Sequence, residues 1–478
     1  MSQVLAAPVL EESQTRHRPS VMVAVLAFAG IVIASMQTLV IPVIPELPRL
    51  LDASPGDTAW TVTATLLAAT IVTPIVGRLA DMYGKRKMLI GSLVLMVVGS
   101  VIAALATSLA PLIVARVLQG LASGVIPLGI SIMRDELPRE RLGAATATMS
   151  SSLGVGAAFG MPAAALIADK ADWHVLFWTS AVLGVVALAL VAVFVPASKI
   201  RTGGKFDLVG ATGLSAALVC LLLAISKGSD WGWSSALVLG LFAAAAVLLV
   251  AWGAFELRTG TPMIDLRTAA RKPVLLTNLA AAAFGFAMFS IQLALPQLLQ
   301  TPEATGYGLG KSMLVAGLAM APQGLVMFFV AKPSAKISAA FGAKVTLMLG
   351  AVTVAAGYVI GVFLMAEIWQ LVLVSCIIGA GIGMAYGAIP TLIMSNVPSS
   401  ETAAANSLNV LIRGFGTTIA SAVAGLILAG VTMTFGGHQL PSQDAFRIIL
   451  AIGAVAALVA MTLAAFLPRQ KIGAHTHH

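Results

Sequence analysis

The sequence contains fourteen apolar segments that are each long enough to cross a membrane as a helix, separated by short polar stretches. A hydrocarbon core about 30 Å thick is spanned by roughly 20 helical residues. In lipid, only helices and closed barrels pair every backbone polar group, and these segments are too long for barrel strands. The sequence therefore predicts an all-α membrane protein. The expected spans are 21–45, 60–78, 87–107, 111–133, 143–167, 174–195, 207–226, 235–255, 275–298, 312–331, 344–364, 369–393, 404–428 and 446–467.

Composition agrees with lipid as the solvent. Of the 478 residues, 59% are hydrophobic and only 10% are charged, whereas a soluble domain carries about a quarter charged residues. The net charge of +9 does not indicate a nucleic-acid partner, because the cations lie between apolar runs rather than on one face. The sequence contains neither a nucleotide-binding G-x-x-x-x-G-K-[ST] loop nor a catalytic constellation. We therefore expect neither an enzyme nor an ATP-driven pump, and no metal or cofactor.

The distribution of Lys and Arg predicts the orientation in the membrane. With the N-terminus inside, 21 of the 28 cationic residues fall on the inner side, five on the outer side, and Arg116 and Arg413 within spans. We expect a multi-pass protein of the cell (inner or plasma) membrane, with both termini cytoplasmic. The polar N-terminus lacks the features of a removable signal peptide, so the first span is expected to direct insertion.

An internal repeat predicts the domain organisation. Similar residues recur about 259 positions apart, a separation that covers eight spans, so the two copies have the same orientation. We expect six-helix bundles at 21–206 and 275–467, two inserted helices within 207–274, cytoplasmic tails at 1–20 and 468–478, and a monomer. The recurring residues include Leu112, Gly120 and Gly124, repeated as Leu371, Gly379 and Gly383, and Ser35 with Gln37, repeated as Ser290 with Gln292.

Four stretches carry a family resemblance. Residues 77–87, with the pattern G-x-L-x-D-x-x-G-K-R-K, form a short polar loop between two spans that resembles the signature loop of the major facilitator superfamily. Residues 112–124, 156–165 and 205–210 resemble motifs of its fourteen-span drug:proton antiporters. The resemblance implies a central cavity, alternating access, and export driven by the proton gradient.

Two residues near the outer surface form the leading hypothesis for proton coupling. Arg116 lies within the fourth span, where a charge is costly unless it is paired, so it either lines a cavity or extends to the outer interface. Glu46 follows the first span and is either a solvated loop acid or a carboxylate that titrates beside Arg116. The acid that the family usually carries before Thr38 is missing here, so the expected proton site lies elsewhere.

Five residues are candidates for binding substrate. Arg413 lies near the middle of the thirteenth span and either binds a polar or anionic group or closes against backbone carbonyls, with Asn409 in reach. The repeat-related Gln37 and Gln292 either present amides to the centre or form interhelical hydrogen bonds. Phe289 is expected in an apolar lining.

Two further sets concern conformational change. In the gate, Asp81 is expected to cap the N-terminus of the thirteenth span, with Lys85 and Arg86 compensating its charge. The complete set of gate residues is Gly77, Arg78, Asp81, Gly84, Lys85 and Arg86. In the fifth span, Gly156, Gly160 and Pro162 either allow close helix packing or, as the resemblance implies, form a hinge or a barrier to proton leak.

The sequence thus predicts a proton-coupled secondary transporter that exports hydrophobic drugs, antibiotics or toxic metabolites. No carboxylate is expected at mid-membrane, whereas Arg413 is, so neutral or anionic substrates are favoured over dications. One alternative is an importer of a small metabolite with the same fold. Another is a non-transporting sensor or lipid-handling protein, against which the charged loop at 77–87 argues.

Overall fold

The computed structural model describes residues 19–40, 43, 47–53, 55–58, 60–197, 203, 206–260, 262–435 and 438–468, and the fold that they form is almost entirely helical. The helices of the N-terminal half are α1 (Pro19–Leu39), α2 (Leu47–Leu50), α3 (Pro55–Thr58), α4 (Trp60–Tyr83), α5 (Lys85–Ala104), α6 (Leu109–Leu121), α7 (Val125–Glu136), α8 (Arg139–Lys170) and α9 (His174–Phe194). They are followed by α10 (Leu208–Trp231), α11 (Ala236–Glu256) and α12 (Leu266–Ala269). The C-terminal half contains α13 (Lys272–Gln300), η2 (Glu303–Thr305), α14 (Met313–Phe329), α15 (Ala331–Phe341), α16 (Ala343–Phe363), α17 (Ile368–Met394), η3 (Ser399–Glu401), α18 (Thr402–Gly430), β1 (Thr432–Phe435), β2 (His438–Pro441) and α19 (Gln443–Ala465).

Thirteen helical segments in the described part of the chain are long and apolar enough to cross a membrane. The segments α6–α7 and α14–α15 each count as one crossing. The 32-residue α8, which contains the expected fifth span, is not among the thirteen, so the count of fourteen stays a prediction. The two predicted tails, 1–20 and 468–478, lie almost wholly outside the described residues.

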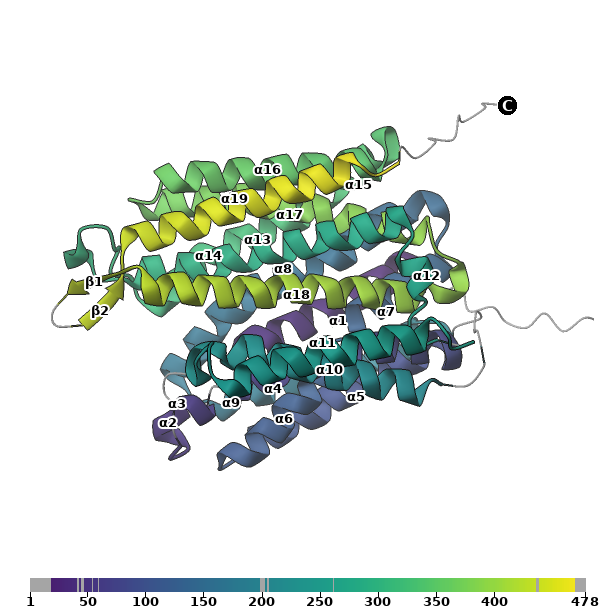
Figure 1. Ribbon diagram of the computed structural model, residues 1–478, viewed down its shortest axis with the longest axis horizontal. Helices are drawn as coiled ribbons and strands as arrows, with labels where there is room; N and C mark the ends of the chain where they lie inside the picture. Colours follow the sequence, from purple (N-terminus) through teal and green to yellow (C-terminus); the bar gives the residue numbers. More distant parts are fainter. Residues whose placement is uncertain are drawn as a thin grey trace, which may run out of the picture.

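The long helices run side by side, with the N-terminal ones (purple to blue) below and the C-terminal ones (green to yellow) above in Figure 1. One end of the bundle carries α12 and is called here the α12 end. The opposite end carries α2, α3 and the antiparallel hairpin β1–β2, and is called the hairpin end.

Helix contacts in the two halves correspond. In the N-terminal half α1 packs against α8 and α9, and α5 packs against α9. In the C-terminal half α13 packs against α18 and α19, and α16 packs against α19. The halves meet through α8 with α14 and α4 with α18, while α10 contacts α4, α18 and its own partner α11. The predicted inserted helices therefore lie beside the contact of the two halves.

Each half has its own apolar core, as expected of helices that pack into a bundle. The C-terminal core contains Phe284, Tyr358 and Ile378, all fully buried, and the N-terminal core contains Leu89 and Leu93. A smaller cluster joins α10 to α4 and α18. These cores hold the helices that line the cavities described below.

The stretch at 77–87 is not the loop that the sequence predicts. Helix α4 continues to Tyr83 and α5 begins at Lys85, so Gly84 alone interrupts the helices. Gly84 has φ 112°, a left-handed conformation that favours glycine and reverses the chain within one residue. The expected fourth span is also interrupted, between Leu121 and Val125.

Candidate functional site

A central cavity of about 220 Å³ lies between α1, α4, α10, α13 and α18. Three of the predicted substrate residues, Gln37, Phe289 and Arg413, line it. The remaining lining residues are Ile33, Leu66, Leu67, Ala69, Thr70, Thr73, Ser123, Ile126, Leu153, Leu222, Ser226, Val410, Leu411, Gly414, Thr417, Thr418 and Ser421. The wall therefore combines apolar side chains and hydroxyls with one guanidinium.

Arg413 is the charged group of this cavity. Its guanidinium lies over the ring of Tyr386, 4.6 Å from the ring centroid, which is cation–π geometry. Within the described part of the chain, the Arg413 side chain makes no hydrogen bond or ion pair. The structure thus gives no support to the alternative that Arg413 hydrogen-bonds to backbone carbonyls. The five N–H donors of its guanidinium are available to a ligand.

The amide of Gln37 faces the same cavity. Its Nε2 donates a long hydrogen bond of 3.4 Å to Ser123 Oγ, and within the described residues its Oε1 accepts no hydrogen bond. The hydroxyls of Thr70 and Thr73 donate to carbonyls of their own helix, so these groups present lone pairs rather than protons. Compared with these groups, Arg413 offers the most N–H donors to the cavity.

A second cavity of about 300 Å³ lies between α1, α8, α13, α14 and α17. Gln292 lines this cavity and not the central one, so the two repeat-related glutamines face different spaces. Phe289 lines both cavities and separates them. The second cavity is lined by Met288, Met320, Met327 and other uncharged residues, which suits an apolar part of a ligand.

Asn409 does not face the central cavity. It is 5% exposed, and its Nδ2 donates to Asn278 Oδ1 of α13 at 2.9 Å. It also borders a space of about 10 Å³ beside Arg413 and Tyr386, too small for an organic ligand. The geometry supports a role for Asn409 in holding α18 against α13.

Arg116 is buried inside the N-terminal half and lines neither cavity. It is 1% exposed, so the interpretation that it extends to the outer interface is wrong. Its Nε donates to the Thr61 carbonyl at 3.0 Å and its Nη1 to Gln119 Oε1 at 2.8 Å. Gln119 in turn donates to Ser100 Oγ, so one network joins α4, α5 and α6. Glu46, the expected partner of Arg116, lies outside the described residues.

The gate residues lie at the α12 end, where the halves meet. The carboxylate of Asp81 accepts hydrogen bonds from the backbone N–H groups of Ala403 and Ala404, in the first turn of α18. This is the contact with the thirteenth span that the sequence predicts. Gly77 allows it, because a Cβ at residue 77 would lie 2.3 Å from Ser407 Oγ and 2.8 Å from the Ala403 carbonyl oxygen.

The cations beside Asp81 have different partners. Lys85 is completely buried, and its Nζ lies 2.7 Å from Asp135 Oδ2 and 3.8 Å from Asp81 Oδ1. Lys85 therefore lies between two carboxylates. The guanidinium of Arg86 donates to the Ala192 carbonyl of α9.

Two contacts of this gate are not predicted from the sequence. Arg134 of α7 donates to Thr402 Oγ1 at 2.9 Å and to the Val397 carbonyl at 3.1 Å, across the two halves. Asn406 of α18 donates to Ser131 Oγ of α7 at 3.4 Å. A signal is present in the sequence, since Arg134 begins three consecutive charges at the end of the fourth span.

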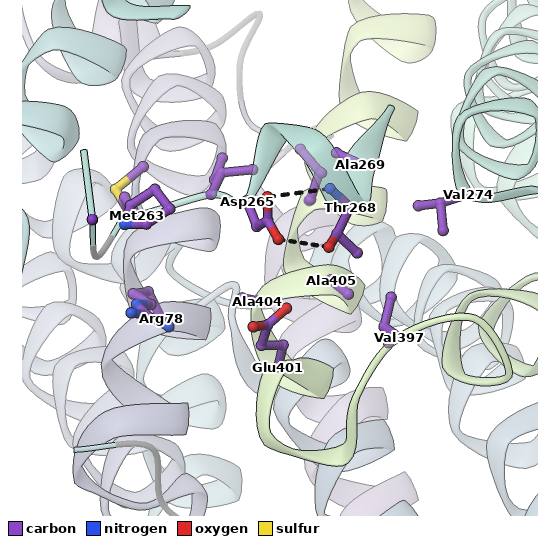
Figure 2. Close-up of a pocket in the computed structure, with 14 residues that line it drawn as sticks. Arg78, Met263, Asp265, Thr268, Ala269, Val274, Val397, Glu401, Ala404 and Ala405 are labelled. Carbon is purple, nitrogen blue, oxygen red and sulfur yellow. Dashed lines mark hydrogen bonds between the residues drawn. The ribbon is translucent and has the colours of Figure 1, made fainter. Parts of the chain in front are cut away.

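Arg78 lines a separate pocket of about 260 Å³ at the α12 end (Figure 2). The other walls come from the connection between α11 and α13, with Met263 and Asp265, and from Glu401, the last residue of η3, next to the start of α18. The Asp265 carboxylate accepts hydrogen bonds from Thr268 N and Oγ1. Burial alone would raise the pKa of Asp265, but these hydrogen bonds hold it below its ordinary value. This pocket shares no lining residue with the central cavity.

The glycines of α8 are positions of close helix approach. A Cβ at Gly156 would lie 2.4 Å from the Cβ of Ala34 and 2.6 Å from the Ile31 carbonyl oxygen, both in α1. A Cβ at Gly160 would lie 2.3 Å from Thr38 Oγ1. The geometry supports the packing interpretation, and Pro162 lies within the same helix.

Comparisons with known proteins agree with this architecture. The chain matches the family model described as Major Facilitator Superfamily over residues 26–421 and, in a second match, 278–476. It is 25% identical over 385 residues to Multidrug resistance protein 3 of Bacillus subtilis (strain 168), covering 78% of this chain and 72% of that protein. It is 27% identical over 401 residues to the "Probable actinorhodin transporter" of Streptomyces coelicolor, covering 80% of this chain and 68% of that protein.

Solved structures show the same fold. The human organic anion transporter MFSD10 superimposes with a TM-score of 0.65 at 14% identity, covering 93% of this chain and 99% of that one. The proton:xylose symporter XylE superimposes with a TM-score of 0.64 at 15% identity, covering 94% and 96%. Together with the match that extends over most of the sequence, these findings show that the chain is a multi-pass transporter of the Major Facilitator Superfamily.

Proposed function

We propose that this transporter exports neutral or anionic organic compounds of drug or antibiotic type by proton antiport, through the central cavity. The observation that carries the proposal is Arg413. Among the described residues that line the central cavity and the second cavity it is the only charged one, and its guanidinium has no hydrogen-bond partner. A dication would meet an unpaired positive charge there, whereas a carboxylate or phenolate would gain charge-assisted hydrogen bonds.

The names of the relatives support an organic substrate. Two relatives are named for multidrug resistance and for actinorhodin transport, and one structural neighbour is described as an organic anion transporter. The second cavity, with Phe289 and methionine side chains, supplies apolar volume and shares Phe289 with the central cavity that contains Arg413. A substrate with an apolar body and one anionic or polar group fits this combination.

The gate contacts support alternating access. Asp81 and Arg134 join the two halves at the α12 end, which the Lys and Arg distribution assigns to the cytoplasm. In this proposal the structure represents a state closed to the cytoplasm. Opening requires the bundles at 21–206 and 275–467 to rock apart at this end.

Proton coupling is assigned to Arg116 and Glu46. Arg116 holds α4 through the Thr61 carbonyl, and α4 supplies Leu66, Thr70 and Thr73 to the central cavity. A change of charge next to Arg116 would therefore act on a helix that lines the substrate site. The substitution Glu46→Gln is expected to abolish the response of export to the proton gradient. Unchanged proton-coupled export would exclude Glu46 and Arg116 as the coupling site.

The test is an efflux assay in cells with and without expression, using an anionic dye, a neutral antibiotic and a dicationic dye. We expect export of the first two, and its loss on addition of a proton uncoupler. Preferred export of the dication would overturn the substrate assignment, and export that survives the uncoupler would overturn the coupling. Uptake in place of efflux in oriented vesicles would indicate an importer.

A further inference from the structure

We infer that the inserted helix α10 is part of the substrate site, with Leu222 and Ser226 forming one wall and the Ser226 hydroxyl contacting the substrate. This inference rests on the proposed function, since it assumes that the central cavity binds the transported compound. Nothing in the internal repeat suggests it, because α10 belongs to neither of the two predicted bundles.

The first part of α10 packs where the two halves meet. Leu214 and Leu218 are buried in a cluster with Ile71 of α4 and Leu411 of α18. Leu214 and Leu218 are four residues apart, and residues with this spacing lie on the same side of a helix. This face of α10 is therefore directed at the contact between α4 and α18.

The row of residues at this spacing, which winds gradually around α10, continues into the central cavity. Leu222 and Ser226 follow Leu218 at the same spacing of four, and both line the cavity that contains Arg413. Toward the α12 end, α4 and α18 touch directly at Gly77 and Asp81. Toward the hairpin end, the side chains of α10 contribute to the cavity between these two helices.

The hairpin end of α10 is attached to α4. The Lys227 ammonium lies 5.5 Å from the centroid of the Trp60 ring, and Lys227 is 4% exposed. Trp60 is the first residue of α4. Because the residue next to Ser226 is held in this way, the position of Ser226 relative to α4 is defined.

The hydroxyl of Ser226 differs from the threonine hydroxyls in the cavity wall. Those of Thr70, Thr73, Thr417 and Thr418 each donate to a carbonyl of their own helix. Within the described residues, the Ser226 hydroxyl makes no hydrogen bond, and the residue is exposed. It therefore has both a donor and acceptor lone pairs for a ligand, whereas the threonines retain only lone pairs.

The placement of α10 is tested by thiol labelling in a background in which Cys220 and Cys376 are replaced by serine. Ser226→Cys is compared with Ala216→Cys, which lies on the same helix but is exposed outside the cavity lining. In protein reconstituted in bilayers, we expect a water-soluble anionic methanethiosulfonate to react at residue 226 and not at residue 216. When Arg413→Gln is added, the anionic reagent should react more slowly at residue 226, relative to a cationic methanethiosulfonate at the same residue. Equal labelling at the two positions would overturn the inference.

The contribution to binding is tested by export. Ser226→Trp fills the cavity and should lower efflux of the bulkiest exported compound by at least about tenfold, whereas Ala216→Trp should leave efflux unchanged. Ser226→Ala should reduce export of hydroxylated compounds more than that of compounds without hydroxyls. If Ser226→Trp and Ser226→Ala both export all tested compounds as the parent protein does, Ser226 does not contact the substrate. If the parent chain exports none of the compounds, the proposed function fails, and the labelling experiment still decides where α10 lies.

Discussion

The carboxylate of Asp81 accepts a hydrogen bond of 2.9 Å from the backbone N–H of Ala404, joining the end of α4 to the first turn of α18. A second bond, from Ala403 N, measures 3.2 Å. The N-terminus of a helix has unpaired N–H groups and a partial positive charge, so a carboxylate there is stabilised. Since α4 and α18 belong to different halves, this contact can exist only while the α12 end is closed.

The substitution Asp81→Asn should therefore favour the state that is open at the α12 end. Hydrogen bonds to a charged group contribute about 1.5–3 kcal/mol, which corresponds to roughly a ten- to hundredfold shift in population. The measurement is the distance between spin labels at Tyr83→Cys and Phe341→Cys, both exposed positions near the α12 end in opposite halves. We expect a longer distance to gain population.

The control for this experiment is Asp444→Asn. Asp444 pairs with Arg447 at the hairpin end and is 72% exposed, so its loss should leave the distance distribution unchanged. If Asp81→Asn also leaves the distribution unchanged, the contact does not hold the gate closed.

Lys85 should be essential for stability because it is buried between two carboxylates. Lys85→Met would leave Asp135 and Asp81 without their cation, and loss of one partner of a buried ion pair costs about 3–5 kcal/mol. Thermal unfolding of the purified protein should show a marked decrease in melting temperature. Adding Asp135→Asn should restore part of the loss, and a double variant less stable than the single one would contradict this assignment.

Arg413→Gln should separate anionic from neutral substrates. The variant removes the charge from the central cavity but retains a side chain that can form hydrogen bonds, so export of an anionic dye should weaken by roughly ten- to hundredfold. Export of a neutral antibiotic should change little. The matched control is Arg447→Gln, a half-exposed arginine at the hairpin end. An equal loss for both substrates would indicate that Arg413 acts on the fold rather than on the ligand.

Gly156→Ala should destabilise the N-terminal half. The added methyl group would lie 2.4 Å from Ala34 Cβ and 2.6 Å from a backbone carbonyl oxygen of α1, and overpacking of this kind costs about 1–3 kcal/mol. Gly143→Ala is the control in the same helix, because no atom beyond the adjacent residues and the nearby backbone of α8 lies within 4 Å of its new methyl group. Thermal unfolding should show a lower melting temperature for the first variant and an equal or higher one for the second.

Several features of the site are predictable from residues along the chain. Arg413 stands out because a charge within an apolar run has to be accommodated inside the protein, and the structure places it in a cavity wall. Asp81 stands out because its spacing from Gly84 and Lys85 resembles a known family pattern. Membrane-spanning helices likewise follow from apolar length, since lipid leaves the backbone few other solutions.

Only the tertiary structure shows which of these residues meet. Gln37 and Gln292 occupy equivalent places in the repeat, yet they face different cavities, because Phe289 lies between the two spaces. Arg116 resembles a cavity residue in sequence, but its partners on α4 and α6 keep it inside one half. The apolar pattern of a span indicates that the span is buried in lipid or protein. It does not indicate which neighbouring helix covers each of its faces. That choice, including the contact of α10 with the central cavity, depends on how all the helices pack together.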